Sequence, residues 1–337
     1  MIPVEELMKG MQNSFITGAT GFIGSNLAEY LVGKGVMVRI LFRKGSNLKL
    51  LDELAVEGYP GNISDKDVLE DAIGASTTVY NAAAETRENL SYEEYETVNI
   101  SGLQSLLEVT KKKNAKKIIH LSSTDIYGVD IPTHPIDETY TAKPRSLFQI
   151  SKAKADNTAL DFQKKHPKLD ITVVRPSITI GPRDVGLTKG LLDMISDGVV
   201  TIPSHGNDPM SFIHVTDLAT ALHLIATSDT TSGQVFHVKG FDATPLELID
   251  SLTQSMEMDV KVRSISPRIS SIMYNLSEYA AKIRSKSNPN RPSVNKLETA
   301  RLLDDSKIRE LGFSPEYSIQ ETADDMASWY RDVKEKG

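Results

Sequence analysis

Short apolar runs and helical patterns alternate along the first half of the chain. The runs NSFITGA, MVRILFR, TTVYNAA, KKIIHLSS and DITVVRP have the length of buried strands. Between them, the segment FIGSNLAEYLVGKG and residues 98–109 and 152–164 carry apolar residues at helical spacing. Strands that alternate with helices in this order are typical of βαβ units. The pattern therefore predicts an α/β fold of the Rossmann type, with an open, doubly wound parallel sheet.

The regular alternation ends near residue 176, and beyond it Gly, Pro and Asp separate shorter elements. We expect a Rossmann domain over residues 1–176, to which the segment at about 212–240 returns, and a smaller, mainly substrate-binding domain over 177–337. In this second part, residues 266–285 place apolar side chains on one helical face. Such a face indicates either packing on the protein's own core or a lid over an apolar substrate.

Charge and hydropathy narrow the classes of partner. The 38 basic and 45 acidic residues give a net charge of -7, which disfavours a nucleic-acid partner. Basic residues cluster between 111 and 117, where a helix is expected to end, and we interpret them as a solvated helix end that suits the helix dipole. No apolar stretch approaches the roughly 20 residues of a membrane span, so we predict none.

Cysteine and histidine usage bears on metals and on redox compartment. The chain contains no Cys, which excludes disulfides, thiolate metal sites and a Cys nucleophile, and a reducing, cytoplasmic location is expected. The seven His residues show no close ligand spacing and no accompanying cluster of carboxylates. We therefore predict no metal site.

A glycine-rich turn joins the first predicted strand to the first predicted helix. Gly18, Gly21 and Gly24 lie in TGATGFIG at this junction. A phosphate approaches a helix N-terminus only if the turn is tight and side chains are absent, because backbone N–H groups and the helix dipole must face it. The preceding strand and the following amphipathic helix supply the context that the motif needs, so we predict a dinucleotide-binding site.

The end of the second strand indicates which dinucleotide is bound. An acidic residue there would accept a hydrogen bond from the ribose 2′-hydroxyl, whereas a basic residue suits a 2′-phosphate. The chain offers Arg43 and Lys44, with no Asp or Glu before Asp52. We therefore predict NADP as the cofactor, with NAD as the second choice.

Several further segments resemble one protein superfamily. Besides TGATGFIGS, they include, in the order in which that superfamily has them, VYNAAAET, VNISGLQSLLE, IIHLSSTDIYG, LFQISKAKAD, VVRPSITIGPRD and FIHVTDLATAL. The chain resembles the extended short-chain dehydrogenases/reductases, the superfamily that includes the NAD-dependent epimerases and dehydratases. It looks most similar to the branch of 3β-hydroxysteroid dehydrogenases and dihydroflavonol reductases, and nucleotide-sugar epimerases and dehydratases are close relatives. The resemblance implies an NAD(P)-binding Rossmann domain, a small-molecule substrate and a homodimer.

The resemblance also implies roles for individual residues. The catalytic positions fall on Ser123, Phe148 and Lys152. The cofactor would contact the glycine turn, the ends of several strands and the catalytic Lys: Gly18, Thr20, Gly21, Phe22, Ile23, Gly24, Arg43, Lys44, Asn62, Ile63, Ala82, Ala83, Ala84, Lys152 and Pro176. The substrate would contact residues after two later strands: Thr124, Asp125, Ser177 and Arg183.

Phe148 departs from the superfamily's pattern, because the resemblance places a Tyr there. Hydride transfer to a carbonyl leaves an alkoxide that needs a proton. A phenol supplies that proton when a nearby ammonium stabilises its anion, and a spacing of four residues puts both groups on one helical face. Phe148 keeps the ring and the spacing to Lys152 but lacks the hydroxyl.

Three explanations of Phe148 remain open at this point. The chain is a reductase whose Tyr was replaced, naturally or to trap a ligand, so that its activity is impaired. Alternatively, another group such as Asp125 performs the proton transfer, because some sugar dehydratases that resemble this fold carry acidic residues in the segment that matches SSTDIYG. In the third explanation, the chain is a non-catalytic protein that binds NADP and uses it for regulation.

Overall fold

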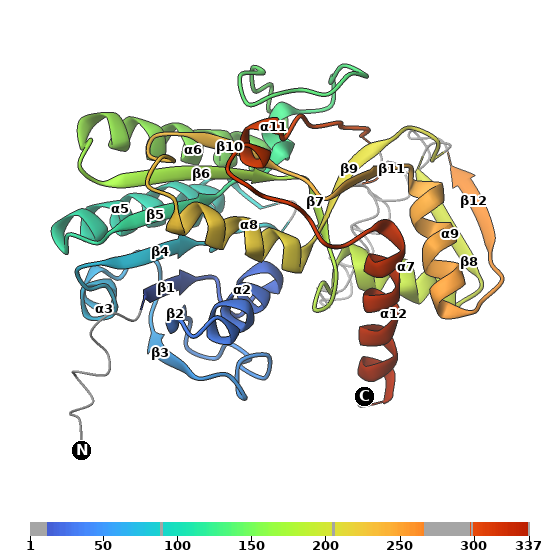
Figure 1. Ribbon diagram of the computed structural model, residues 1–337, viewed down its shortest axis with the longest axis horizontal. Helices are drawn as coiled ribbons and strands as arrows, with labels where there is room; N and C mark the ends of the chain where they lie inside the picture. Colours follow the sequence, from blue (N-terminus) through green and yellow to red (C-terminus); the bar gives the residue numbers. More distant parts are fainter. Residues whose placement is uncertain (1–11, 88–89, 204–205, 266–296, 298, 336–337) are drawn as a thin grey trace.

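The structure is a computed structural model that describes residues 12–87, 90–203, 206–265, 297 and 299–335 (Figure 1). The amphipathic segment 266–285 lies outside the described residues. Within the described ranges, no helix is both long and apolar enough to cross a membrane.

A seven-stranded parallel sheet forms the centre of the larger part of the fold. From one edge to the other its order is β3-β2-β1-β4-β5-β6-β10, and every neighbouring pair is parallel. Its strands are β1 Asn13–Thr17, β2 Met37–Phe42, β3 Val56–Pro60, β4 Thr77–Asn81, β5 Lys117–Leu121, β6 Asp170–Pro176 and β10 Val235–Val238. The chain moves outward from β1 and then crosses to β4, so the strand order reverses between β1 and β4. Open α/β sheets bind ligands beyond the carboxyl ends of the strands at such a reversal. The predicted Rossmann-type α/β fold is confirmed.

Helices cover both faces of this sheet (Figure 1). On one face, α2 Phe22–Gly33 and α8 Val215–Thr227 pack together and bury Leu27 and Leu222 in one apolar core. The other face carries α3 Lys66–Ala72, α5 Leu103–Lys112 and α6 Leu147–Lys165, whose buried side chains form a second core with the sheet. Two short elements precede α5: α4 Tyr92–Tyr95 and a π-helical turn, η1 Glu96–Gly102.

The remaining elements form a second, smaller body of structure (Figure 1). One small sheet contains β7 Ile178–Ile180, β9 Met210–His214 and β11 Phe241–Ala243, and another contains β8 Val199–Pro203 and β12 Lys261–Ile265. With α7 Leu187–Ser196, α9 Pro245–Met256 and α12 Ile319–Glu335 they enclose a third apolar core. Between α9 and α12, α11 Ser306–Arg309 instead packs beside β10. A domain boundary at residue 176 stays a prediction.

Lys117 differs from the solvated helix end expected for the basic cluster. It begins β5 and is only 1% exposed. Its Nζ donates to the carbonyl oxygen of Ile225 at 2.8 Å and to Oγ1 of Thr231 at 2.9 Å, and it pairs with Asp170 at 3.0 Å. The expectation was wrong for Lys117 because the strand starts inside the basic run, and the ammonium there binds groups from α8 and β6.

Candidate active site and cofactor site

The glycine turn has the close approaches that a phosphate-binding turn requires. Gly18 has φ +72°, and a Cβ there would lie 2.7 Å from backbone atoms of Ala82 and Ala83. A Cβ on Gly24 would lie 2.2 Å from the carbonyl oxygen of Gly18. Gly21 is the N-cap of α2, which has neither a side-chain cap nor an acidic residue in its first turn. Backbone N–H groups at this helix start are therefore available to an anion.

The other predicted cofactor residues of this half lie near the same edge of the sheet. Arg43 and Lys44 follow β2 and are exposed. Ile63 is buried against η1, where a Cβ on Gly102 would lie 2.4 Å from its Cγ2. The remaining side chains of this half are half-buried. Three lie in or just after the glycine turn and three directly after β4: Thr20, Phe22, Ile23, Ala82, Ala83 and Ala84.

Phe148 and Lys152 lie one turn apart at the start of α6. The helix begins with a capping box in which Ser146 and Gln149 bond each other's backbone N–H, five residues before the predicted start. The ring of Phe148 lies tilted against that of Tyr95, with centroids 6.1 Å apart. Lys152 is 3% exposed, and its Nζ donates to the carbonyl oxygen of Leu121 at 2.7 Å.

Lys152 is mainly charged at neutral pH and loses its proton at a lower pH than an exposed lysine. Burial lowers the pKa of Lys152 to about 8, while the carboxylates of Asp156 and Asp125 oppose this shift. An ammonium in such a setting can bind hydroxyl groups as a donor and can also release its proton close to physiological pH.

The turn after β5 carries the other predicted catalytic and substrate residues. Ser123 caps the 3-10 turn η2 Thr124–Tyr127, and its Oγ accepts from the backbone N–H of Asp125 at 3.1 Å. Thr124 Oγ1 donates to the carbonyl oxygen of Pro176 at 3.2 Å. This bond joins the ends of β5 and β6, which brings Ser123 and Pro176 to the same edge as the glycine turn.

Arg301 is a site residue that the sequence interpretation missed. Its Nη1 pairs with Oδ1 of Asp125 at 3.2 Å, and its Nη2 donates to the carbonyl oxygen of Gly128 at 3.0 Å. Arg301 is 6% exposed and comes from the chain after residue 300. A carboxylate held in an ion pair is a poor proton donor, so this contact argues against Asp125 as the source of the proton.

Asn99 is a second missed residue. It lies in η1, where its Oδ1 accepts from the N–H of Glu85 at 2.7 Å. Its Nδ2 donates to Ser151 Oγ at 2.9 Å, and that hydroxyl donates to the carbonyl oxygen of Phe148 at 2.7 Å. Asn99 therefore fixes the loop after β4 against the first turn of α6. The signal was present in VNISG, which the resemblance included without a role for the Asn.

Arg183 and Ser177 lie beyond β6 in different surroundings. Arg183 has φ +74° and turns toward α2, where it pairs with Glu29 at 2.8 Å and donates to the carbonyl oxygen of Ser25 at 3.1 Å. The hydroxyl of Ser177 is buried and has no hydrogen-bond partner among the described residues. Substrate contacts for both residues stay predictions.

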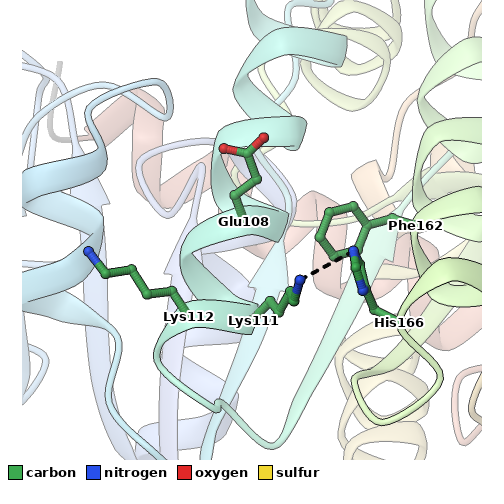
Figure 2. A pocket seen from close by; sticks show the side chains of 5 residues that line it. All are labelled: Glu108, Lys111, Lys112, Phe162 and His166. Atoms are coloured by element: carbon green, nitrogen blue, oxygen red, sulfur yellow. Dashed lines mark hydrogen bonds between the residues drawn. The ribbon is translucent and has the colours of Figure 1, made fainter.

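A hollow on the outside of α5 and α6 lies at the opposite end of the sheet (Figure 2). Its lining includes Glu108, Lys111, Phe162 and His166, and Lys111 Nζ lies 3.5 Å from Nε2 of His166. These residues come from the last turns of helices that lead into β5 and β6, so they mark the amino edge of the strands. The hollow is therefore separate from the predicted cofactor site.

Comparison with known proteins identifies the family. The profile of the NAD dependent epimerase/dehydratase family matches residues 14–238, which include the glycine turn, η2 and the start of α6. The chain belongs to this family. The predicted family membership is thereby confirmed.

Named relatives of the chain include both reductases and sugar-modifying enzymes. A 4-hydroxy-2-methyl-3-oxo-4-farnesyl-3,4-dihydroquinoline-1-oxide ketoreductase from Stigmatella aurantiaca is 25% identical over 244 residues, with 72% of each chain covered. A dTDP-glucose 4,6-dehydratase from Streptomyces niveus is 26% identical over 340 residues, covering 94% of this chain and 92% of the relative.

A sugar-nucleotide epimerase is among the solved structures with a similar fold. It is a tyrosine-to-phenylalanine mutant of UDP-glucuronic acid 4-epimerase from Bacillus cereus, in complex with UDP-4-deoxy-4-fluoro-glucuronic acid and NAD. The TM-score is 0.75 at 22% identity, and the match covers 96% of this chain and 100% of that one.

Proposed function

We propose that this protein is an NAD(P)-dependent oxidoreductase that acts on a carbonyl or secondary alcohol of a small molecule, and that Phe148 impairs its proton transfer. The observation that carries the proposal is the placement of Phe148 one helical turn before the buried Lys152, on the helix that faces the turn of Ser123. In this arrangement the glycine turn and Lys152 can bind a cofactor, but the phenol oxygen that would donate a proton is missing at Phe148.

Each residue has a defined task in this proposal. The glycine turn and the first N–H groups of α2 bind the pyrophosphate, and Lys152 binds ribose hydroxyl groups. The hydroxyl of Ser123 accepts from Asp125 N–H, so its own hydrogen can be donated to a substrate oxygen. When bound, the nicotinamide supplies or accepts the hydride. The ring of Phe148 can contact a substrate but cannot donate a proton to it.

The loss of the phenol slows chemistry far more than it weakens binding. General acid catalysis contributes roughly 10² to 10⁴ in rate, or about 3 to 5 kcal/mol of barrier. The tyrosine-to-phenylalanine epimerase mutant with the same fold is in complex with NAD and a sugar nucleotide. That complex supports the expectation that a site of this kind binds its ligands without the phenol oxygen.

Restoring the hydroxyl tests the proposal. Phe148→Tyr is screened for oxidation of NADPH and NADH with a panel of ketones and aldehydes, and for reduction of NADP and NAD with secondary alcohols. We expect turnover by Phe148→Tyr that exceeds that of the unmodified chain by about 10² to 10⁴ on the same substrate.

Phe162→Tyr serves as the matched control, because it adds the same oxygen to the same helix at the outer hollow. We expect it to leave the rate unchanged. A Phe148→Tyr rate equal to that of the unmodified chain on a confirmed substrate rejects the proposal.

A nucleotide-sugar epimerase or dehydratase is the second candidate. It is favoured by the similarity to dTDP-glucose 4,6-dehydratase over nearly the whole of both chains. Such a reaction returns the hydride to the sugar, so it converts a UDP- or dTDP-sugar without a net change in NAD(P)H. Chromatography of the sugar nucleotides with Phe148→Tyr distinguishes it from a reductase. NADPH binding with no turnover in either screen indicates a non-catalytic binding protein.

NADP is the proposed cofactor because Arg43 and Lys44 follow β2 and no acidic residue occupies that strand end. We expect NADPH to bind more tightly than NADH, and Arg43→Ala to weaken NADPH binding about tenfold while leaving NADH binding unchanged. Lys49→Ala is the control, since it removes an exposed basic residue further along the same loop. Tighter binding of NADH by the unmodified chain would overturn the NADP assignment.

A homodimer is also proposed, on the resemblance to the superfamily. The outer surface of α5 and α6 is lined at one end by Glu108, Lys111 and Lys112, so a dimer through these helices would contain charged contacts. Light scattering of the purified chain at two salt concentrations tests this state. A mass of about 37 kDa in both conditions rejects it.

A further inference from the structure

A chain of buried polar side chains crosses the sheet behind the proposed site. Thr17 Oγ1, at the end of β1, accepts from the N–H of Ala83 at 3.2 Å and donates to Asn81 Oδ1 at 2.7 Å. The amide nitrogen of Asn81 must then face Nδ1 of His120, which lies 3.0 Å away. Nδ1 of His120 is therefore an acceptor, and the hydrogen of the neutral ring lies on Nε2.

The hydrogen on His120 Nε2 points toward a buried carboxylate. Asp156 Oδ1 lies 3.7 Å from Nε2, which is too long for a direct hydrogen bond. The other oxygen of Asp156 accepts from Nε of Arg175 at 2.9 Å. Burial and the positive charges of Lys152 and Arg175 lower the pKa of His120 well below its usual value, so its ring is neutral.

Nε2 of His120 has no hydrogen-bond partner among the described residues. Ser122 and Asp156 are buried in the same region, and the Ser122 hydroxyl lowers the pKa of the Asp156 carboxyl against the effect of burial. A buried donor such as Nε2 is costly to leave without a hydrogen bond. A water molecule commonly satisfies two to four buried polar groups at once, and one donor, one carboxylate oxygen and one hydroxyl suit it.

Asp156 follows Lys152 by one turn of α6 and contributes the carboxylate on that side of the ammonium. The titratable and charged groups around Lys152 come from four elements. His120 on β5, Asp125 on η2 and Asp156 on α6 act on Lys152 itself, while Tyr127 on η2 and Arg175 on β6 act on Asp156. Arg175 pairs with Asp156, and Arg301 pairs with Asp125. Of the two carboxylates that raise the pKa of Lys152, Asp156 has the larger effect.

We propose that Asp156 is a positioning residue for Lys152, and that a buried water molecule held by His120, Ser122 and Asp156 fixes the Asp156 carboxylate. This inference rests on the proposed role of Lys152 in cofactor binding. The carboxylate keeps the ammonium charged in a buried setting, while the His120 chain from Thr17 joins it to the strand that precedes the glycine turn.

The pH dependence of NADPH binding tests the role of Asp156. The dissociation constant is measured by fluorescence titration from pH 6 to 10 for the unmodified chain, Asp156→Asn and Asp156→Glu. The unmodified chain should lose affinity as pH rises through about 8, where Lys152 loses its charge. Asp156→Asn should move this midpoint down by about one pH unit, and Asp156→Glu should restore it.

The titrations with NADPH, and with NADH in parallel, distinguish a failure of the proposed function from a failure of the proposed role of Asp156. Absence of binding of both NADPH and NADH by the unmodified chain at every pH rejects the proposed function and this inference with it. Binding by the unmodified chain with an unchanged midpoint in Asp156→Asn overturns the role of Asp156 alone.

A crystal structure of the unmodified chain with ordered waters provides the second test, which does not depend on the folding of a variant. A water within hydrogen-bond distance of His120 Nε2, Ser122 Oγ and Asp156 Oδ1 supports the inference. A structure with ordered waters elsewhere in the core and none beside His120 Nε2 overturns it.

Discussion

Replacing Gly18 by alanine tests the geometry of the proposed phosphate-binding turn. Gly18 and Gly35 have nearly the same backbone conformation, with φ +72° and φ +73°. An L-residue in this left-handed region costs roughly 1 to 2 kcal/mol, and both substitutions carry that cost. Only at Gly18 would the new Cβ lie 2.7 Å from the backbone of Ala82 and Ala83, because nothing lies within 4 Å at Gly35.

The two variants therefore differ in whether the turn must move. We expect Gly35→Ala to lower the free energy of unfolding by about 1 to 2 kcal/mol and to bind NADPH as the unmodified chain does. Gly18→Ala must shift the turn away from the loop after β4, which misaligns the N–H groups of α2. A loss of about 1.4 kcal/mol or more in binding energy corresponds to at least a tenfold rise in the dissociation constant.

Urea unfolding and calorimetric titration with NADPH measure the two effects separately. Equal NADPH dissociation constants of Gly18→Ala and Gly35→Ala would show that the close approach at Gly18 does not position the N–H groups of α2. A Gly18→Ala protein that is less stable but binds normally would show that the turn does not contact the phosphates.

Two further predictions concern groups outside the glycine turn. Arg301→Gln should lower the free energy of unfolding, measured with urea, by about 1 to 3 kcal/mol, because the buried Arg301 bonds Asp125 and the turn of η2. Lys164→Gln, which removes an exposed ion pair, is the control and should have almost no effect. Burial lowers the pKa of His237 from 6.5 to about 4, so the unfolded chain gains a proton first as pH falls through this range. The free energy of unfolding should decrease by about 3 kcal/mol between pH 6.5 and pH 4 on account of this group. His237→Gln should remove that part of the slope in urea titrations, and an unaltered slope would count against the assignment.

Features that depend on neighbouring residues could be predicted from the sequence. The strands around the glycine turn follow from apolar runs, and the turn itself follows from three glycines between a strand and a helix. The periodicity of apolar residues predicts a start of α6 at residue 152, which is five residues late because the capping box of Ser146 and Gln149 sets the true start. The π-helical turn in η1 likewise interrupts the predicted helix at 98–109 without a signal in the apolar pattern.

Features that depend on contacts between distant segments could not be predicted. Asn81 and His120 are 39 residues apart, Tyr127 and His237 are 110 apart, and Arg301 reaches a turn that lies 176 residues earlier. The parallel sheet brings the first two pairs together because the carboxyl ends of its strands share one edge, whereas Arg301 reaches η2 from the chain beyond residue 300. Asp156 has a local signal, since a position four residues after Lys152 lies on the same face of the helix.

The most direct test of the central claim is the single-turnover rate of hydride transfer from bound NADPH to a substrate found in the screen. It is followed by the loss of nicotinamide absorbance in the unmodified chain and in Phe148→Tyr at saturating cofactor. We expect similar NADPH dissociation constants in the two proteins and a rate that is about 10² to 10⁴ higher with the tyrosine. Equal rates in the two proteins would contradict it, because the missing phenol oxygen would then have no part in the chemistry.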